Sequence, residues 1–266
     1  MAAINSIFII KGIEASQVNL VMNDYAAGLP SPLSFLGLGD VLARKLELKP
    51  WSASILPILH MVKISEGRTK PEMSNTNTSK FGPIEITENM IGSVHLTFLL
   101  SLPGCHSQSS IQNIILGCRI AGGLIQKQVE ITEEPPDGRI FTKIKRGYAI
   151  IPPTEKKQRL IASGNNDDLV SIARMLEAKF ANGDWLVPVS VGYKLIEDPD
   201  DIKVRKYSRC DNVPHVFAEP VLGIAKLVSV RNPQLTQLNG SKFKSSLWSW
   251  DICDDLILGH STYRTN

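Results

Sequence analysis

The sequence predicts an α+β fold in which short strands alternate with helices. Three observations support this prediction: a continuous apolar run at residues 6–11, a helical spacing of apolar residues over 32–46, and apolar residues at every second position over 93–102. The chain has 266 residues, of which 43% are hydrophobic and 21% charged. This is the composition of an ordinary globular protein that buries a large core.

The first helix is predicted from its start signals. Pro32 is acceptable in the first turn of a helix but not in its interior, and Ser31 before it is a good N-cap. Gly37 and Gly39 leave the helix backbone bare on one side. Two explanations remain open: close packing of the helix on a sheet, or a helix start at which Ser31 and Ser34 meet a phosphate or a base.

The next elements follow in the order strand, arm, strand, helix, strand. The sequence predicts them at residues 55–64, 67–89, 93–102, 109–119 and 124–131. Arg119, at the end of the second helix, is followed by Gly122 and Gly123, which stop the helix and allow a close backbone approach. Together with the first strand and helix, this is the order of a ferredoxin-like fold, which RNA-recognition modules share.

The arm at residues 67–89 is polar and nearly empty of large aliphatic side chains. It adds little to a core, so we expect it to protrude. It contains the cations Arg68, Lys70 and Lys80 and the aromatic Phe81. Composition alone leaves two interpretations open, a binding arm and an ordinary surface loop.

The C-terminal part predicts a helix at residues 167–181 and a strand at 184–193. Trp185 and Tyr193 lie on that strand, where aromatic residues are more often core than base-stacking. For Trp248 and Trp250 we expect either packing inside the protein or a contact with another subunit.

Positive charge is concentrated in one segment, although the formal net charge of the chain is only +3. Residues 139–159 hold seven cations and one acid, with Lys143, Lys145 and Arg146 close together. A cationic cluster beside a polar arm is typical of a phosphate-binding surface, because each neutralised phosphate releases counterions. A solvated basic face is the plainer alternative.

Several features argue against other classes of protein. The four cysteines form no CxxC pair and the five histidines are scattered, so we expect no metal site, and we expect no cofactor. The N-terminus has no secretion signal, and no apolar run reaches the length of a membrane span. We therefore expect a cytoplasmic protein without membrane contact.

Seven segments, in order along most of the chain, together resemble one family. The segments are residues 26–44 around LPSP, GRTK at 67–70, SVHLTFLL at 93–100, RIAGGLI at 119–125, RGYAII at 146–151, WLVPVSVGY at 185–193 and LWSW at 247–250. Together they resemble the Csy-two family, the Cas-five-type subunit of the type I-F CRISPR surveillance complex.

The resemblance implies one ferredoxin-like repeat-associated domain over residues 1–266, with a thumb hairpin at about 67–90 and a β-rich extension at about 160–266. It implies a non-catalytic subunit that caps the 5′ handle of the CRISPR RNA (crRNA) and contacts the first Cas-seven-type backbone subunit. A large subunit commonly shares the handle in this family, and the assembled complex binds double-stranded target DNA by guide pairing. The residues we expect to bind RNA are Ser31, Ser34, Arg68, Lys70, Lys80, Phe81, Arg119, Gly122, Gly123, Lys143, Lys145 and Arg146.

Two alternatives stay open. Some Cas-five-type relatives cut precursor RNA, and His60, Lys63 and His95 lie near the arm in sequence, where a general acid and base would be needed. A generic single-stranded RNA-binding module would keep the fold and the basic residues but not the CRISPR partners.

Overall fold

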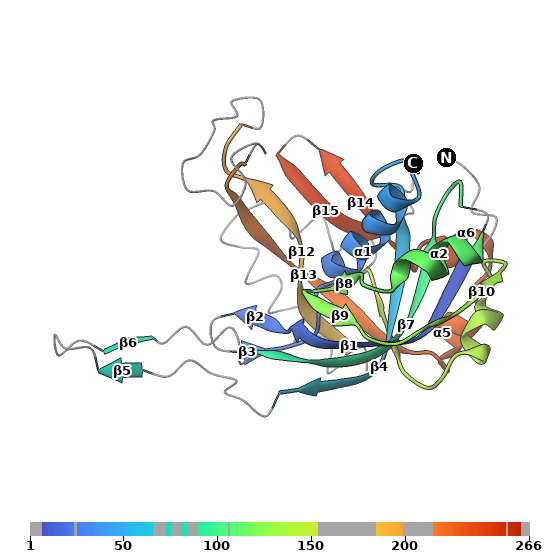
Figure 1. Ribbon diagram of the computed structural model, residues 1–266, viewed down its shortest axis with the longest axis horizontal. Helices are drawn as coiled ribbons and strands as arrows, with labels where there is room; N and C mark the ends of the chain where they lie inside the picture. The colour runs from blue at the N-terminus through green and yellow to red at the C-terminus, as the bar shows by residue number, and fades with distance from the viewer. Residues whose placement is uncertain are drawn as a thin grey trace.

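The computed structural model describes residues 7–23, 26–65, 73–75, 81–83, 90–105, 107–153, 185–198, 215–253 and 255–261. Within these residues the fold is α+β, with few helices around one large sheet (Figure 1). All strand pairings among the described residues of this sheet are antiparallel. The predicted α+β class is confirmed.

The helical elements are α1 (Pro32–Lys45), α2 (Gln108–Ile115), the 3-10 helix η2 (Gly138–Lys143), α5 (Pro233–Thr236) and α6 (Gly240–Lys244). The strands of the large sheet are β1 (Ile7–Asn19), β4 (Ser54–Ile64), β7 (Ile91–Ser101), β8 (Arg119–Ile120), β9 (Gly123–Ile125), β10 (Glu130–Glu134), β11 (Tyr148–Ile151), β12 (Trp185–Leu195), β13 (Ala218–Ser229), β14 (Trp248–Cys253) and β15 (Leu256–Ser261). Two short pairs lie outside it: β2 (Val21–Asn23) with β3 (Ala26–Ala27), and β5 (Met73–Asn75) with β6 (Phe81–Pro83).

The N-terminal half forms a four-strand unit in the order β10–β1–β7–β4. β1 is long enough to hold two partners along one edge: β10 pairs with its first half and β9 with its second. The register of β1 against β7 shifts at two places, near Gly12 and Gln17, and both residues have a positive φ. These irregularities allow one strand to follow the twisted sheet over its whole length.

The C-terminal strands extend the same sheet and close it into a ring. β4 pairs with β14 at its start and with β11 farther along, and the circuit runs β4–β14–β15–β12–β13–β11 and back to β4. Trp248 is completely buried here, and its indole N–H donates to the carbonyl of Ile150, which joins β14 to β11. The predicted packing role of Trp248 is confirmed.

Alternating side chains of the strands build a core on each face of the sheet. Val94, Leu96, Phe98 and Leu100 of β7 face α1 and α2, as their spacing predicts. On the opposite face Leu99 packs in a second core with Phe141 of η2, Leu235 of α5 and Phe243 of α6. Part of the sheet is therefore covered on both sides.

Three local predictions differ from the structure. The second helix ends at Ile115, because Gly117 takes a positive φ of 82° that the helix cannot continue through. The strand predicted at residues 124–131 is split into β9 and β10, which pair with different halves of β1. Trp185 and Tyr193 are 55% and 44% exposed, so their interpretation as core residues was wrong.

The predicted arm is partly described. β5 and β6 pair antiparallel, and in Figure 1 they lie apart from the main sheet. The helix predicted at residues 167–181 lies outside the described residues. In the part of the chain that the structure describes, no helix is both long and apolar enough to cross a membrane.

Candidate nucleic-acid interface

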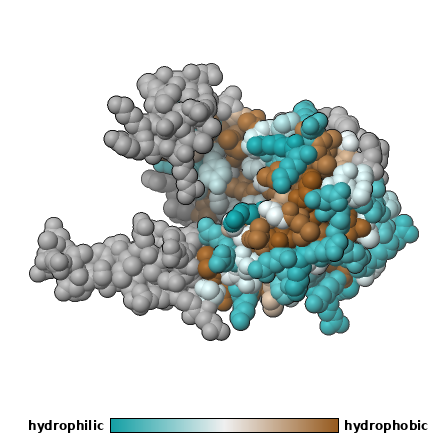
Figure 2. All heavy atoms as spheres, viewed as in Figure 1, coloured by the Kyte–Doolittle hydropathy of each residue, from teal (hydrophilic) through white to brown (hydrophobic). Residues whose placement is uncertain are grey.

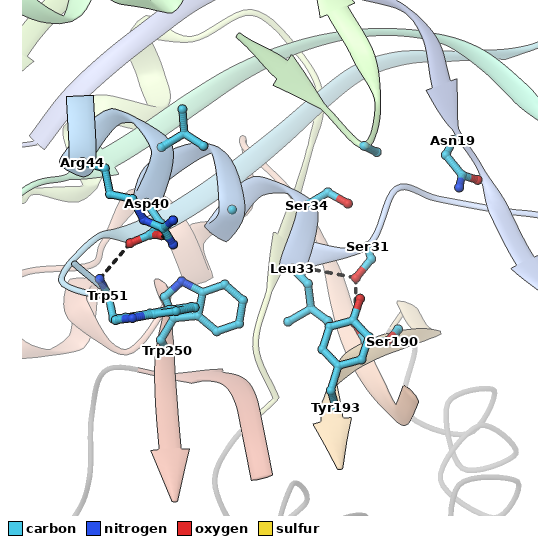
Figure 3. Close-up of a pocket in the computed structure, with 13 residues that line it drawn as sticks. Asn19, Ser31, Leu33, Ser34, Asp40, Arg44, Trp51, Ser190, Tyr193 and Trp250 are labelled. Atoms are coloured by element: carbon cyan, nitrogen blue, oxygen red, sulfur yellow. Dashed lines mark hydrogen bonds and ion pairs between the residues drawn. The ribbon is translucent and has the colours of Figure 1, made fainter. Parts of the chain in front are cut away.

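A groove runs along one side of α1 (Figure 3), with a volume of roughly 570 Å³. We call it the α1 groove. Residues from α1, β12, β14 and the β8–β9 turn form its walls, so segments far apart in sequence meet there. Its lining residues are Asn19, Ser31, Leu33, Ser34, Gly37, Asp40, Val41, Arg44, Trp51, Ala121, Ser190, Tyr193 and Trp250.

The start of α1 is capped from within the chain. The Ser31 hydroxyl accepts a hydrogen bond from the Leu33 N–H at 3.2 Å and donates to the Ser190 carbonyl at 2.8 Å. The Ser34 N–H donates to the Ser31 carbonyl at 3.0 Å. Since Pro32 has no N–H, the donors at this helix start already have partners, and a phosphate finds few of them free.

The two glycines of α1 face different surroundings. A Cβ on Gly39 would lie 2.9 Å from the Cβ of Ala53 and 3.2 Å from Ile55, so this glycine lets α1 pack closely on the sheet. A Cβ on Gly37 would meet nothing within 4 Å, and Gly37 lines the groove. The close-packing explanation therefore holds for Gly39, whereas contact of Ser31 and Ser34 with a phosphate or a base stays a prediction.

Gly37 belongs to a stripe along the open side of the helix. Ser34, Gly37, Val41 and Arg44 are three or four residues apart, which places them on one face. The other face carries the buried Phe35, Leu38 and Leu42. The groove therefore lies along a helix face that no other described element covers, and at its centre Gly37 has no side chain.

One end of the groove is aromatic and electrically balanced. The rings of Trp51 and Trp250 pack edge to face, with centroids 5.2 Å apart, and the guanidinium of Arg44 lies 5.6 Å from the Trp51 ring. Arg44 also forms an ion pair with the buried carboxylate of Asp40, which accepts the Trp51 N–H at 2.8 Å. Arg44 and Asp40 are the charged residues of the lining among the described residues, so their charges cancel.

The other end of the groove is polar. Figure 3 shows Tyr193 and Ser190 beside Ser31, away from the two tryptophans. Asn19 and Ala121 close this end, and the Asn19 N–H donates to the Ala121 carbonyl at 2.8 Å. Hydroxyl, amide and aromatic groups thus line one continuous hollow.

The β8–β9 turn and its flanking strands hold three predicted RNA-binding residues, Arg119, Gly122 and Gly123. Arg119 is exposed, and its guanidinium donates to the Gly122 carbonyl at 2.8 Å. A Cβ on Gly123 would lie 2.5 Å from Val18 and 2.6 Å from the Ser16 carbonyl, so the predicted close backbone approach is made to β1. Ala121 of this turn lines the groove, and contact of Arg119, Gly122 and Gly123 with RNA stays a prediction.

The predicted cations near β11 lie outside the groove. All three cations are exposed, but Lys143 forms an ion pair with Glu134 at 2.6 Å, whereas Lys145 and Arg146 have no ion pair with any described residue. Next to them the exposed rings of Tyr148 and Trp185 stack, with centroids 5.5 Å apart and planes within 1° of parallel. We call Lys145, Arg146, Tyr148 and Trp185 the β11 surface.

His60 lies beside these cations with both ring nitrogens engaged. Its Nδ1–H donates to the Arg146 carbonyl at 2.9 Å, and Nε2 accepts from the buried Thr97 hydroxyl at 2.8 Å. Burial lowers the pKa of His60, and the charges of Lys145 and His95 lower it further against the effect of the Arg146 carbonyl. His60 is therefore held neutral. On β4 and β7, His95 lies opposite Met61 and Lys63 lies opposite Ser93, with the Val62–Val94 pair between them.

Most of the remaining predicted residues lie outside the described ranges. Arg68, Lys70 and Lys80 fall among residues that the structure does not describe, and Phe81 opens β6. The sequence reasoning did not find Arg44, Trp51 and the groove position of Trp250. The stripe at Ser34, Gly37, Val41 and Arg44 was visible in the sequence and would have pointed to Arg44.

Within the described ranges, no group of His, Cys, Asp or Glu side chains is arranged to hold a metal ion.

Comparison with known protein families gives a match in the C-terminal part of the chain. A family model described as CRISPR-associated protein (Cas_Csy2) matches residues 172–255, about a third of the chain. The matched segment contains Ser190, Tyr193 and Trp250 of the α1 groove and Trp185 of the β11 surface. No curated protein matches the chain. The resemblance of this chain to the Csy2 subunit of the type I-F CRISPR complex is thereby confirmed.

Proposed function

We propose that this chain is a non-catalytic subunit of a type I-F CRISPR effector complex that binds and caps the 5′ handle of the crRNA. The Csy2 match over residues 172–255 supports a subunit of a CRISPR Csy complex. The observation that carries the finer proposal is the α1 groove, an open hollow beside α1 with aromatic, hydroxyl and amide groups in its walls. Such groups bind the bases and sugars of unpaired RNA.

The proposed fold of the N-terminal half is ferredoxin-like, with a thumb. The neighbours β10–β1–β7–β4, interleaved with α1 and α2, match the order expected for that fold. The β5–β6 hairpin is the proposed thumb, at the place where the resemblance puts it. Arg68, Lys70 and Lys80 lie next to β5 and β6 in sequence, and we include them among the RNA-binding cations.

The proposed binding mode differs from that of an RNA-recognition module, which stacks bases on an open sheet face. Here η2, α5 and α6 cover the sheet face opposite α1, where Phe141 and Phe243 are fully buried. RNA therefore binds beside α1 rather than on the covered part of the sheet. The phosphates leaving the groove would be neutralised by exposed cations, among which we include Arg119, Lys145 and Arg146.

Binding without cleavage is favoured by the state of His60. A general base needs a nitrogen lone pair free to accept the 2′-hydroxyl proton. In His60 the Nε2 lone pair accepts the Thr97 hydroxyl, and burial keeps the ring neutral, so it is a poor acid as well. This supports the capping role over the endoribonuclease alternative.

The proposed protein partners are the first Cas-seven-type backbone subunit and, where present, a large subunit, with target DNA bound by the assembled complex. Exposed apolar side chains offer places for such contacts. Figure 2 shows hydrophobic residues gathered over the region of α2, β8 and β9, which carries the exposed Leu116 and Leu124. Acting with crRNA, the subunit would work in the cytoplasm.

A retention experiment tests this proposal. The chain is produced with its partner subunits and mixed with labelled RNA copied from the repeat of its own CRISPR array, with or without the handle. We expect uncut RNA to be retained, and removal of the handle to release it. Equal retention without the handle would indicate a generic RNA-binding module. Cleavage that stops on 2′-deoxy substitution and on His60→Ala would indicate a nuclease.

A further inference from the structure

The α1 groove has the size of a small-molecule site but little charge to offer a phosphate. Its volume of roughly 570 Å³ falls within the roughly 300–1,000 Å³ typical of ligand sites. Arg44 is neutralised by the buried Asp40, and the donors at the start of α1 are taken by Ser31. A phosphate in the groove would lose its hydration without gaining a free cation or a free helix terminus.

Its aromatic walls instead suit an uncharged flat ring. Trp51 and Tyr193 are 43% and 44% exposed, and Trp250 lies against Trp51. Figure 3 shows the indole of Trp250 and the ring of Tyr193 on the same side of α1, near opposite ends of the groove. Faces of this kind bind nucleobases regardless of their identity, because every base has a π-face.

One polar atom at this site lacks a partner. The indole N–H of Trp250 is buried and makes no hydrogen bond. Among the described residues, it is the one buried side-chain nitrogen or oxygen that lacks a hydrogen-bond partner. An unpaired buried donor is unfavourable, and its presence in a folded protein calls for an explanation. The nitrogen has almost no exposed surface, so an acceptor atom on a ligand would reach it only after the Trp250 ring turned toward the groove.

From these observations we infer that the α1 groove is a site for one unpaired nucleobase, with its phosphates outside. Gly37 forms the bare centre against which the base lies, and Trp250 and Tyr193 contact the ring. This inference rests on the proposed function, which supplies the base from the handle RNA. The bound base is held by stacking and hydrogen bonds, so its affinity depends little on salt.

The indole signals of the four tryptophans test the inference directly. The 266-residue chain, labelled with ¹⁵N, is titrated with adenosine, guanosine, cytidine, uridine, their 5′-monophosphates and inorganic phosphate. We expect at least one nucleoside to shift the Trp250 indole resonance and leave that of Trp185, outside the groove, in place. Its monophosphate should bind within about twofold of the nucleoside, and phosphate alone should have no effect.

Variants separate the groove from other surfaces. Gly37→Leu fills the groove on an open helix face, so it should abolish the nucleoside shift while the protein stays folded. Tyr193→Ala should weaken binding about 5- to 100-fold, whereas Phe217→Ala, which removes an exposed ring outside both the groove and the β11 surface, should not. No shift with any nucleoside, a shift retained in Gly37→Leu, or an equal shift with phosphate alone would overturn the inference.

RNA retention by the complex distinguishes this inference from the proposed function. If the complex with Gly37→Leu retains handle RNA as well as the unmodified complex does, the groove is not the base site, although the chain still binds the handle. If the unmodified complex retains no handle RNA, the proposed function fails, whatever the nucleosides do.

Discussion

The α1 groove and the β11 surface differ in enclosure and in charge. The groove is a hollow whose charges, Arg44 and Asp40, cancel each other. The β11 surface is open, with two exposed cations that no described acid neutralises and a stacked pair of exposed rings. A hollow with balanced charge suits a base, and an open cationic surface suits phosphates. We therefore expect the two regions to supply different parts of RNA binding.

The largest effect should come from filling the groove. Gly37→Leu puts a side chain where a Cβ meets nothing within 4 Å, so we expect handle RNA to bind about 10- to 100-fold more weakly to the complex. Leu is a better helix former than Gly, so the free energy of unfolding should rise by about 0.5–1 kcal/mol. Filter binding and thermal unfolding measure the two effects. Loss of affinity together with loss of stability would contradict this assignment.

The second glycine of α1 provides the contrast. Gly39→Val forces atoms against Ala53 and Ile55, which we expect to lower the free energy of unfolding by about 1–3 kcal/mol. The folded fraction of Gly39→Val should bind RNA as tightly as the unmodified chain does, because Gly39 faces the core. Denaturant unfolding with binding at low temperature checks both points. A stable Gly39→Val variant with weakened binding would reverse the roles of the two glycines.

Removing charge from the β11 surface should have a smaller, salt-dependent effect. Changing Lys145 and Arg146 together to Gln should reduce the log–log salt slope of RNA binding by about 1.4, since each phosphate contact on a single strand contributes roughly 0.7. Lys143→Gln is the matched control, because Lys143 is already paired with Glu134. Titrations at several salt concentrations give the slopes. Equal changes in slope for Lys143→Gln and for the double variant would show that ion pairing does not decide which cations bind RNA.

The smallest effect concerns the neutral His60 beside the β11 surface. Its pKa is lowered by burial in the folded chain, so below about pH 6.5 the unfolded chain binds more protons than the folded one. Stability should therefore fall as the pH drops from about 6.5 toward the lowered pKa. Thermal unfolding across this range should show a weaker pH dependence for His60→Gln. An unchanged dependence in the variant would place the sensitive group elsewhere.

Local signals predicted the local parts of this structure well. Ser31 and Pro32 fix the start of α1 because capping depends on neighbours in sequence, and the alternation from Val94 to Leu100 gives β7 its buried face. The split between β9 and β10 was missed because it depends on which half of β1 each segment pairs with.

The candidate site was harder to predict, because its walls come from distant segments. Trp51 follows α1, Tyr193 lies on β12 and Trp250 on β14, and the strand circuit brings them together through pairs such as Trp248 with Ile55. Ser31 and Ser34 were found from the helix start alone. Trp185 and Tyr193 were misassigned because an aromatic residue on a strand gives no local sign of whether its side of the sheet is covered.

Ultraviolet crosslinking of the assembled complex, followed by mass spectrometry of the peptide–nucleotide adducts, tests the central claim most directly. We expect the 5′ handle to crosslink intact to Trp51, Tyr193 or Trp250 in the α1 groove, and Gly37→Leu to remove these adducts. Handle adducts confined to other parts of the chain or to other subunits, with none in the groove, would contradict the account.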